Sequence, residues 1–183
     1  MSTIALKQSN KLSVKTQTMS ATIAIVAAVV LPQLFHVMGA VSGLGTALGE
    51  TFLPMHLPIL LVGFLAGPYA GAVAGVCSPL ISFALTQMPT SAMLPFMMIE
   101  LCIYGLAAGL LRNVKMPTIL KVVIAQLAGR AVRAAAILMA TYGFASTAVP
   151  VAIIWKSIVT GIFGLVLQWT LLPLIIYRVE NAK

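Results

Sequence analysis

The chain has 183 residues, of which 61% are hydrophobic and 8% are charged; its mean hydropathy is +1.08 and its formal net charge is +8. A soluble domain has roughly a quarter charged residues, so the composition excludes one, and the length allows about six membrane helices of about 20 apolar residues. Most basic residues lie at the ends of apolar runs, where they orient membrane helices, which excludes a nucleic-acid partner.

The first third of the chain contains two apolar runs separated by a glycine-rich stretch. Residues 1–18 are polar and predict a cytoplasmic segment. The run at 19–38, "MSATIAIVAAVVLPQLFHVM", imitates a signal peptide but is long enough to span, so we expect an uncleaved first helix. Residues 39–54 form a glycine-rich connection without a clear helical start or stop, and a short apolar segment follows at 55–66.

Four longer helices are expected in the rest of the chain, at 68–87, 92–111, 118–142 and 151–177. The clusters "MPTS", "RNVKMP" and "GFASTAVP" separate them as loops. The sequence therefore predicts an all-α membrane protein, a bundle of six transmembrane helices whose second helix is short. Its transmembrane domain covers 19–178, between the N-terminal segment at 1–18 and a cytoplasmic tail at 179–183.

Lysine and arginine are distributed unequally between the two sides of this bundle. With six crossings the outer connections at 39–54, 88–91 and 143–150 contain neither residue. By the positive-inside rule both termini are cytoplasmic. The cytoplasmic side collects Lys7, Lys11, Lys15, Arg112, Lys115, Lys121, Arg178 and Lys183.

The second apolar segment, within "GETFLPMHLPILLVGFLAGP" (49–68), is too short to cross a bilayer upright. Its dozen apolar residues would extend roughly 18 Å as a helix, against about 30 Å of hydrocarbon. We therefore expect a short or broken helix shielded by its neighbours. Glu50 and His56 would lie at its outer mouth, as candidates for a gate beside a binding site.

Four charged residues remain inside the predicted helices: Glu100, Arg130, Arg133 and Lys156. Charges at this depth cost at least a few kcal/mol each, so they should face protein or water and be paired or functional. Arg130 and Arg133 share a helix face, and one acid cannot neutralise both. A cavity lined by all four has a formal charge of +2 and favours a carboxylate or phosphate. Alternatively, Glu100 pairs with one arginine and Lys156 extends to the interface; Tyr104, Gln126 and Trp155 are candidate polar or stacking neighbours.

No motif for catalysis or for metal binding is found. The sequence lacks HExxH, a glycine-rich phosphate loop and a nucleophile motif, and neither histidine has a carboxylate at metal-ligand spacing. Cys77 and Cys102 lie in apolar runs, as buried free thiols do. We expect no enzyme activity, no metal and no cofactor, so energy for any transport would come from a partner or a gradient.

Small residues four apart occur on several helices and allow close helix contact in membranes. They are Ala24 and Ala28, then Gly67, Gly71 and Gly75, then Gly105 and Gly109, with Gly161 and Gly164 three apart. For the glycines of the third and fourth helices we expect packing within the bundle.

The chain resembles the substrate-binding S component of an energy-coupling factor (ECF) vitamin transporter. The resemblance rests on its length, on six helices with both ends inside, on the alanine face of the first helix, and on the long first outer loop. It also rests on "LPMHLPILLVGFLAGPYAGAVAGVCSPLISFALTQMP" (53–89) and "MLPFMMIELCIYGLAAGLL" (93–111), so that it covers most of the chain.

The resemblance implies high-affinity binding of a water-soluble vitamin in a pocket near the outer side of a bacterial plasma membrane. It also implies ATP-driven uptake with a transmembrane coupling subunit, which Ala24 and Ala28 would contact, and two cytoplasmic ATPases that use the ATP. The candidate ligand-binding residues are Glu50, His56, Glu100, Tyr104, Gln126, Arg130, Arg133 and Lys156. Pantothenate and cobalamin are the first candidate substrates and folate the third. The alternative is a small gradient-driven transporter or channel that oligomerises through its glycine faces.

Overall fold

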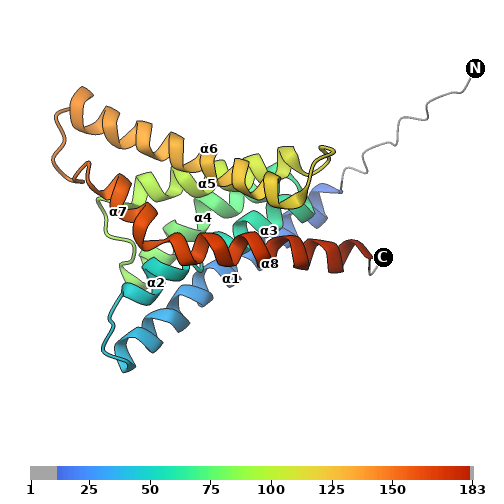
Figure 1. The fold of residues 1–183 in the computed structure, drawn as a ribbon, viewed down its shortest axis with the longest axis horizontal. Coiled ribbons are helices and arrows are strands. Elements are labelled where there is room, and N and C mark those ends of the chain that lie inside the picture. Colours follow the sequence, from blue (N-terminus) through green and yellow to red (C-terminus); the bar gives the residue numbers. More distant parts are fainter. Residues whose placement is uncertain (1–11, 182–183) are drawn as a thin grey trace, which may run out of the picture.

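The computed structural model describes residues 12–181, which form helices and short connections (Figure 1). Lys7, Lys11 and Lys183 of the predicted charge asymmetry lie outside this part of the chain. In order, the elements are α1 (Val14–Val41), α2 (Ala47–Phe52), α3 (His56–Ala66), α4 (Pro68–Thr86), α5 (Leu94–Leu111), α6 (Thr118–Leu138), the π-helical η1 (Met139–Gly143), α7 (Ile153–Thr160) and α8 (Ile162–Asn181).

Six helical stretches are long and apolar enough to cross a membrane, and α2 and α3 together form the second of them, Ala47–Ala66. The predicted all-α architecture with six spans is therefore confirmed. The start of α1 and the end of α8 lie at the same end of the bundle, as an even number of crossings requires (Figure 1). The cytoplasmic orientation of that end stays a prediction.

The first helix is longer than expected at both ends. The Ser13 side chain accepts a hydrogen bond of 3.2 Å from the Thr16 backbone N–H, which caps α1 before Val14 rather than near residue 19. At its other end α1 continues to Val41, and the predicted connection contains α2. A count of apolar residues misses these turns because capping and local hydrogen bonds, rather than hydropathy, form them.

The expected sixth helix at 151–177 is not continuous, because α7 and α8 are separate helices that meet at Gly161. A Cβ built on Gly161 would lie 2.9 Å from Leu53 Cδ1, and one built on Gly164 would lie 2.7 Å from the backbone of Phe52. The two glycines thus let the start of α8 approach the end of α2 closely. The break accompanies a tertiary contact that the local sequence does not reveal.

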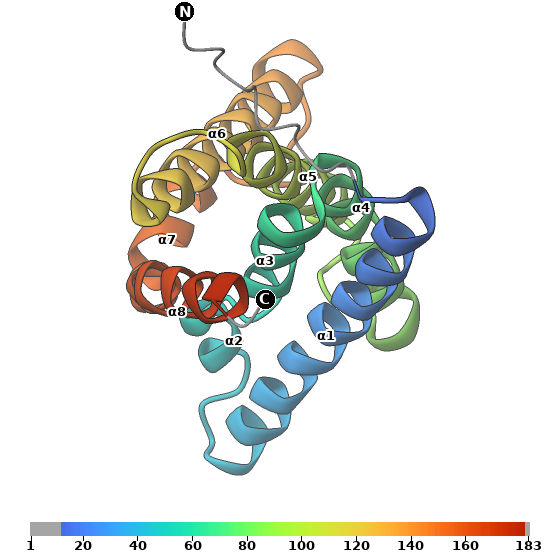
Figure 2. The ribbon, with the colours of Figure 1, turned by 90° about the vertical axis from the view of Figure 1, so that its right-hand side faces the viewer.

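The second span is broken and shielded, as its length predicts. Leu53 adopts a left-handed conformation (φ 50°) between α2 and α3, and Pro54 follows. Helix α3 lies in the centre of the bundle and contacts α1, α4, α5 and α8 (Figure 2). In the most apolar stretch of this span 50% of the residues are buried, against 22–39% in the other spans. Surrounding protein, rather than lipid, covers this short helix.

Glycines bring α4 and α5 into backbone contact. A Cβ on Gly71 would overlap the backbone of Gly105, and a Cβ on Gly105 would overlap that of Gly71. Gly75 meets the backbone of Leu101 in the same way, and Gly109 meets that of Pro68. The glycine faces of the third and fourth spans therefore pack within the bundle, as expected from their spacing.

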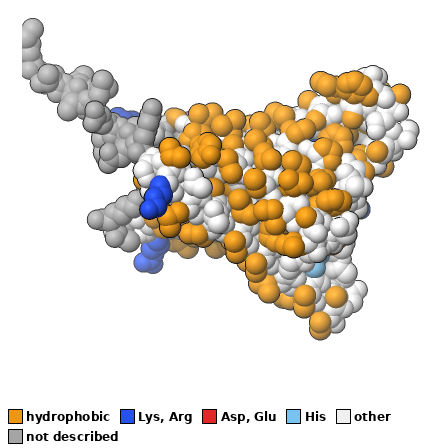
Figure 3. Space-filling view, turned by 180° about the vertical axis from the view of Figure 1, so that it is seen from behind, with side chains coloured by type: hydrophobic (Ala, Val, Ile, Leu, Met, Phe, Trp, Pro, Cys, Tyr) orange, Lys and Arg blue, Asp and Glu red, His pale blue; other side chains and the backbone are white. Residues whose placement is uncertain are grey.

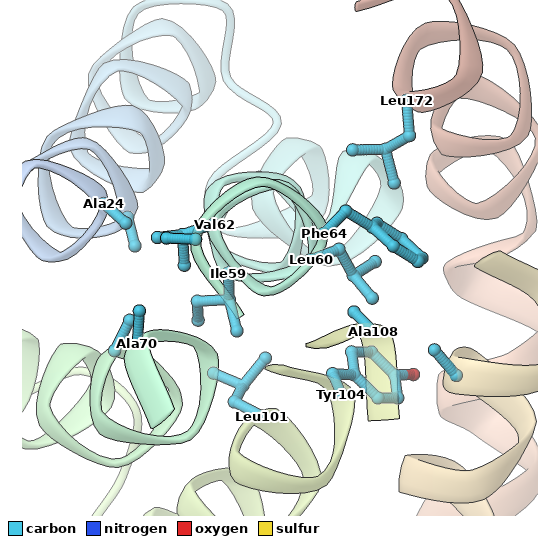
Figure 4. Close-up of a cluster of buried hydrophobic side chains, with 14 of the residues drawn as sticks. Ala24, Ile59, Leu60, Val62, Phe64, Ala70, Leu101, Tyr104, Ala108 and Leu172 are labelled. Carbon is cyan, nitrogen blue, oxygen red and sulfur yellow. The ribbon is translucent and has the colours of Figure 1, made fainter. Parts of the chain in front are cut away.

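The core surrounds α3, whereas the outer surface is apolar, as a lipid environment requires (Figures 3 and 4). Ile59 and Val62 lie toward α1 and α4, and Leu60 and Phe64 lie toward Tyr104 and α8 (Figure 4). Most of the Lys and Arg side chains visible in Figure 3 gather at the end where α1 begins and α8 ends. The opposite end contains the candidate site.

Candidate functional site

A cavity of about 520 Å³ lies at the end of the bundle opposite the start of α1 and the end of α8. Its wall comes from α1, α2, the α2–α3 junction, α3, α4, the α4–α5 connection, α5, α6 and α7. Helices from both halves of the chain therefore contribute to the wall. Such a volume suits a small organic ligand.

Six of the eight predicted ligand-binding residues line this cavity, and they come from five different helices. Tyr104 and Gln126 do not line it, although both are buried. Ligand binding by each of these side chains stays a prediction. The six residues are Glu50, His56, Glu100, Arg130, Arg133 and Lys156.

Glu100 and Arg133 form a buried ion pair between α5 and α6. Arg133 Nη1 lies 2.6 Å from Glu100 Oε2, and the two side chains are 11% and 2% exposed. The Tyr104 hydroxyl donates a second hydrogen bond, of 3.0 Å, to Glu100 Oε1. Both carboxylate oxygens are therefore engaged, and the charge of Arg133 is compensated within the protein.

Arg130 lies three residues before Arg133 on α6, but its charge is not compensated in the same way. Its Nη1 donates a 3.3 Å hydrogen bond to the Ser157 backbone carbonyl of α7. Its Nε is buried and has no hydrogen-bond partner among the described residues. No described carboxylate lies within salt-bridge distance of it. Arg130 therefore brings a positive charge and an unused donor to the cavity wall.

Two exposed charges of opposite sign, Glu50 on α2 and Lys156 on α7, also line the cavity. Thr46 Oγ1 donates a 3.3 Å hydrogen bond to Glu50 Oε1. Three cations and two carboxylates line the cavity, which gives a formal charge of 3 − 2 = +1. The sequence predicted a formal charge of +2, because Glu50 was not counted with the charges inside the helices. The charge of the wall is still positive.

Gln126 belongs to a hydrogen-bond network beside the cavity. Its Nε2 donates to Gln168 Oε1 (2.8 Å), and its Oε1 accepts from Trp169 Nε1 (2.7 Å). Gln168 Nε2 in turn donates to the Leu53 carbonyl (3.3 Å). The network thus ties α6 and α8 to the α2–α3 junction, of which Leu53 lines the cavity.

Methionines form part of the wall that sequence reasoning did not identify. Met88, Met93 and Met97 lie on the α4–α5 connection and on α5, and Met55 lies at the α2–α3 junction. The only signal for them is the density of methionine in "QMPTSAMLPFMM" (87–98), which also fits a lipid-facing segment. His36, Ser82 and Ser157 also line the cavity.

The structure places Ala24 and Ala28 in the interior of the bundle. They are 6% and 0% exposed and belong to the core beside α3 and α4 (Figure 4). The exposed face of α1 instead presents larger side chains such as Ile23, Val26 and Val30. Contact of the two alanines with a coupling subunit stays a prediction.

Within residues 12–181, no group of three or more His, Cys, Asp and Glu side chains could hold a metal ion. Cys77 and Cys102 are free and half-buried, and neither lines the cavity. The residues that line the cavity can offer a ligand hydrogen bonds, charge and apolar contact.

Comparison with known proteins identifies the family. A family model described as the substrate-specific component of ECF transporters matches residues 13–176. Comparisons with curated proteins and with solved structures found no match. The match covers all six candidate spans apart from the end of α8. The chain therefore belongs to the family of substrate-specific components of ECF transporters.

Proposed function

We propose that this protein is the S component of an ECF-type ABC importer and binds a small anionic vitamin in the cavity between α2, α5, α6 and α7. The family supports a substrate-binding transporter subunit rather than an enzyme or a gradient-driven channel. The residues that line the cavity support an anionic ligand, and pantothenate is the first candidate.

The observation that carries this proposal is the state of Arg130. Among the described residues, Arg133 is neutralised by Glu100 and Lys156 is exposed, whereas Arg130 forms no ion pair and its buried Nε has no hydrogen-bond partner. An unmade hydrogen bond at a buried charged group is costly, and a carboxylate is the strongest partner for a guanidinium. A ligand carboxylate beside Arg130 would satisfy both the donor and the charge.

The size of the cavity ranks the candidate vitamins. Pantothenate, a small acid with one carboxylate, fits within about 520 Å³. Cobalamin, a corrin macrocycle with a nucleotide tail, is far larger than such a cavity. Folate is longer than pantothenate and carries two carboxylates, whereas the formal charge of the wall is +1. Pantothenate therefore precedes both.

Uptake in this proposal requires a transmembrane coupling subunit and two cytoplasmic ATPases, because the family is that of the substrate-specific subunit. The chain would reside in a bacterial plasma membrane, with the cavity facing outward and the basic end in the cytoplasm. Coexpression with an energising module tests the assembly. Copurification of the three partner chains and vitamin uptake that stops on ATP depletion are expected. Uptake that continues without ATP would contradict this proposal.

The ligand itself is tested with the purified full chain. Mass spectrometry should identify a small acid that copurifies with the protein, and titration should rank pantothenate above folate and cobalamin. Arg130→Ala should weaken binding of that acid by about tenfold or more, the scale of a charge-assisted hydrogen bond. The matched control is Arg178→Gln, which replaces an exposed arginine in the last turn of α8, and it should leave the affinity within about twofold of wild type. Equal affinity in wild type and Arg130→Ala would contradict the anion site.

A further inference from the structure

His56 contributes a second buried polar side chain to the cavity wall. It is the first residue of α3, lines the cavity and is only 4% exposed. Its Nδ1 atom is buried and has no hydrogen-bond partner among the described residues. A buried polar side chain without a full set of partners costs free energy, and the imidazole is the polar group of α3 that a ligand in the cavity would contact.

The imidazole ring is held by packing rather than by a flexible loop. The ring centroids of His56 and Tyr104 lie 5.3 Å apart at an interplanar angle of 57°. Tyr104 is fully buried, and its hydroxyl donates to Glu100. A Cβ on Gly129 of α6 would overlap the Tyr104 ring, so the glycine makes room for it. The position of Nδ1 is therefore set before a ligand arrives.

Much of the remaining wall has little hydrogen-bonding capacity. Met88, Met93 and Met97 line the cavity with Pro89, and the thioethers are weak acceptors that adapt to apolar shapes. An apolar ligand body would contact these side chains, whereas a highly polar body would leave its own groups without partners.

The charges of the wall favour a ligand with a single anionic group. Glu100 uses both oxygens on Arg133 and Tyr104, and its carboxylate compensates the charge of Arg133. The exposed Glu50 and Lys156 have opposite formal charges. Among the described residues of the wall, Arg130 is the one cation that is neither exposed nor paired with a carboxylate.

We propose that the cavity selects a monocarboxylic acid whose apolar body carries a hydroxyl group, and that the His56 imidazole hydrogen-bonds this group while Arg130 binds the carboxylate. A hydroxyl group can donate or accept, so either tautomer of the imidazole serves. The inference rests on the proposed function, because it assumes that the cavity is the substrate site. His56 would then determine specificity, and Arg130 would provide the anchor common to all acids.

The experiment compares two probe acids that differ only in hydroxylation: pantothenate and the matched N-acyl-β-alanine that lacks both hydroxyls. The full-length protein in detergent should prefer pantothenate by about tenfold, because a site built for a hydroxyl rejects the analogue without it. In His56→Phe, which keeps a ring beside Tyr104, this preference should fall to about twofold or less. His56→Gln keeps a polar group that can donate or accept at the end of the side chain and should restore part of this preference.

Thermal unfolding of each variant shows that it is folded, and the preference is a ratio measured within one variant. A tenfold preference that persists in His56→Phe would overturn the inference, as would equal binding of the two acids by the wild type. In either case a loss of both affinities in Arg130→Ala would leave the proposed function intact. Failure of both acids to bind the wild type would instead contradict the proposed function and, with it, this inference.

Discussion

Replacement of Glu100 by glutamine separates a structural role of the buried ion pair from a role in ligand binding. Glutamine keeps an oxygen that can accept from Tyr104 but removes the negative charge beside Arg133. The side chain of Arg133 is 11% exposed, and its Nη1 lies 2.6 Å from the carboxylate. In Glu100→Gln the guanidinium therefore remains almost buried and without its counter-charge.

The expected cost follows from this geometry. Loss of one partner from a fully buried ion pair costs about 3–5 kcal/mol. The retained hydrogen bond and the residual exposure of Arg133 reduce this to about 2–3 kcal/mol. For a chain of this length 1 kcal/mol corresponds to a Tm shift of about 2–4 °C, so Tm should fall by about 4–12 °C.

The assay is thermal unfolding of the detergent-solubilised chain, followed by tryptophan fluorescence, for the two single variants and the double variant. Arg133→Gln should also destabilise, because it leaves a buried carboxylate. The double variant Glu100→Gln/Arg133→Gln should lose about 1–3 kcal/mol less than the sum of the single losses. Additivity within about 0.5 kcal/mol would refute the argument that the pair stabilises the fold.

The same variants report on ligand binding. Glu100→Gln raises the formal charge of the cavity wall from +1 to +2, so affinity for an anionic ligand should hold or increase. A loss of affinity of tenfold or more in a folded Glu100→Gln protein would instead show that the carboxylate itself binds the ligand. In that case the ion pair is part of the recognition site.

Further variants test other contacts by thermal unfolding and hydrogen exchange. Gly105→Ala should lower the free energy of unfolding by about 1–3 kcal/mol, because its Cβ would overlap the backbone of α4. The control Gly143→Ala should change stability little, because the atom nearest to its Cβ is 3.7 Å away. Equal effects of the two substitutions would contradict backbone contact between α4 and α5. Gln168→Leu should speed amide exchange at the α2–α3 junction, because its hydrogen bond there is lost, and unchanged exchange would argue against this tie. Ala28→Leu should lower the free energy of unfolding by about 1–3 kcal/mol, because the larger side chain overpacks the interior. Val26→Leu, on the exposed face of α1, should leave it almost unchanged. A larger loss in Val26→Leu than in Ala28→Leu would contradict the interior position of Ala28.

The spans could be predicted from the sequence because each is a separate apolar run bounded by turn residues. The short second span was predictable too, since length alone showed that it must be covered by protein. The break between α7 and α8 could not be predicted, because it accompanies the approach of Gly161 and Gly164 to α2, a contact between distant parts of the chain. Helix α2 was missed for a similar reason, as its six residues are too few for a periodic pattern.

For the cavity, ionisable residues were the informative signal. A charge within an apolar helix must face protein or water, and this alone selected Glu100, Arg130 and Arg133 for the same wall. Methionine carries no such constraint, because it is equally stable against lipid, so Met93 and Met97 were not distinguished from lipid-facing residues. The cost of desolvation thus explains both which part of the wall was predictable and which part was not.

Arg130 and Arg133 show what the structure adds to that rule. Their spacing on one helix face makes them equivalent in the sequence, yet Arg133 pairs with Glu100, whereas Arg130 donates to a backbone carbonyl and forms no ion pair among the described residues. A paired arginine contributes to the fold, and an unpaired one leaves a charge that a ligand can neutralise. Loss of Arg133 should therefore reduce stability first, whereas loss of Arg130 should reduce affinity first. Depth in the membrane predicts that each arginine is either paired or functional. The contacts in the structure indicate that Arg133 is the structural one and Arg130 the ligand-binding one.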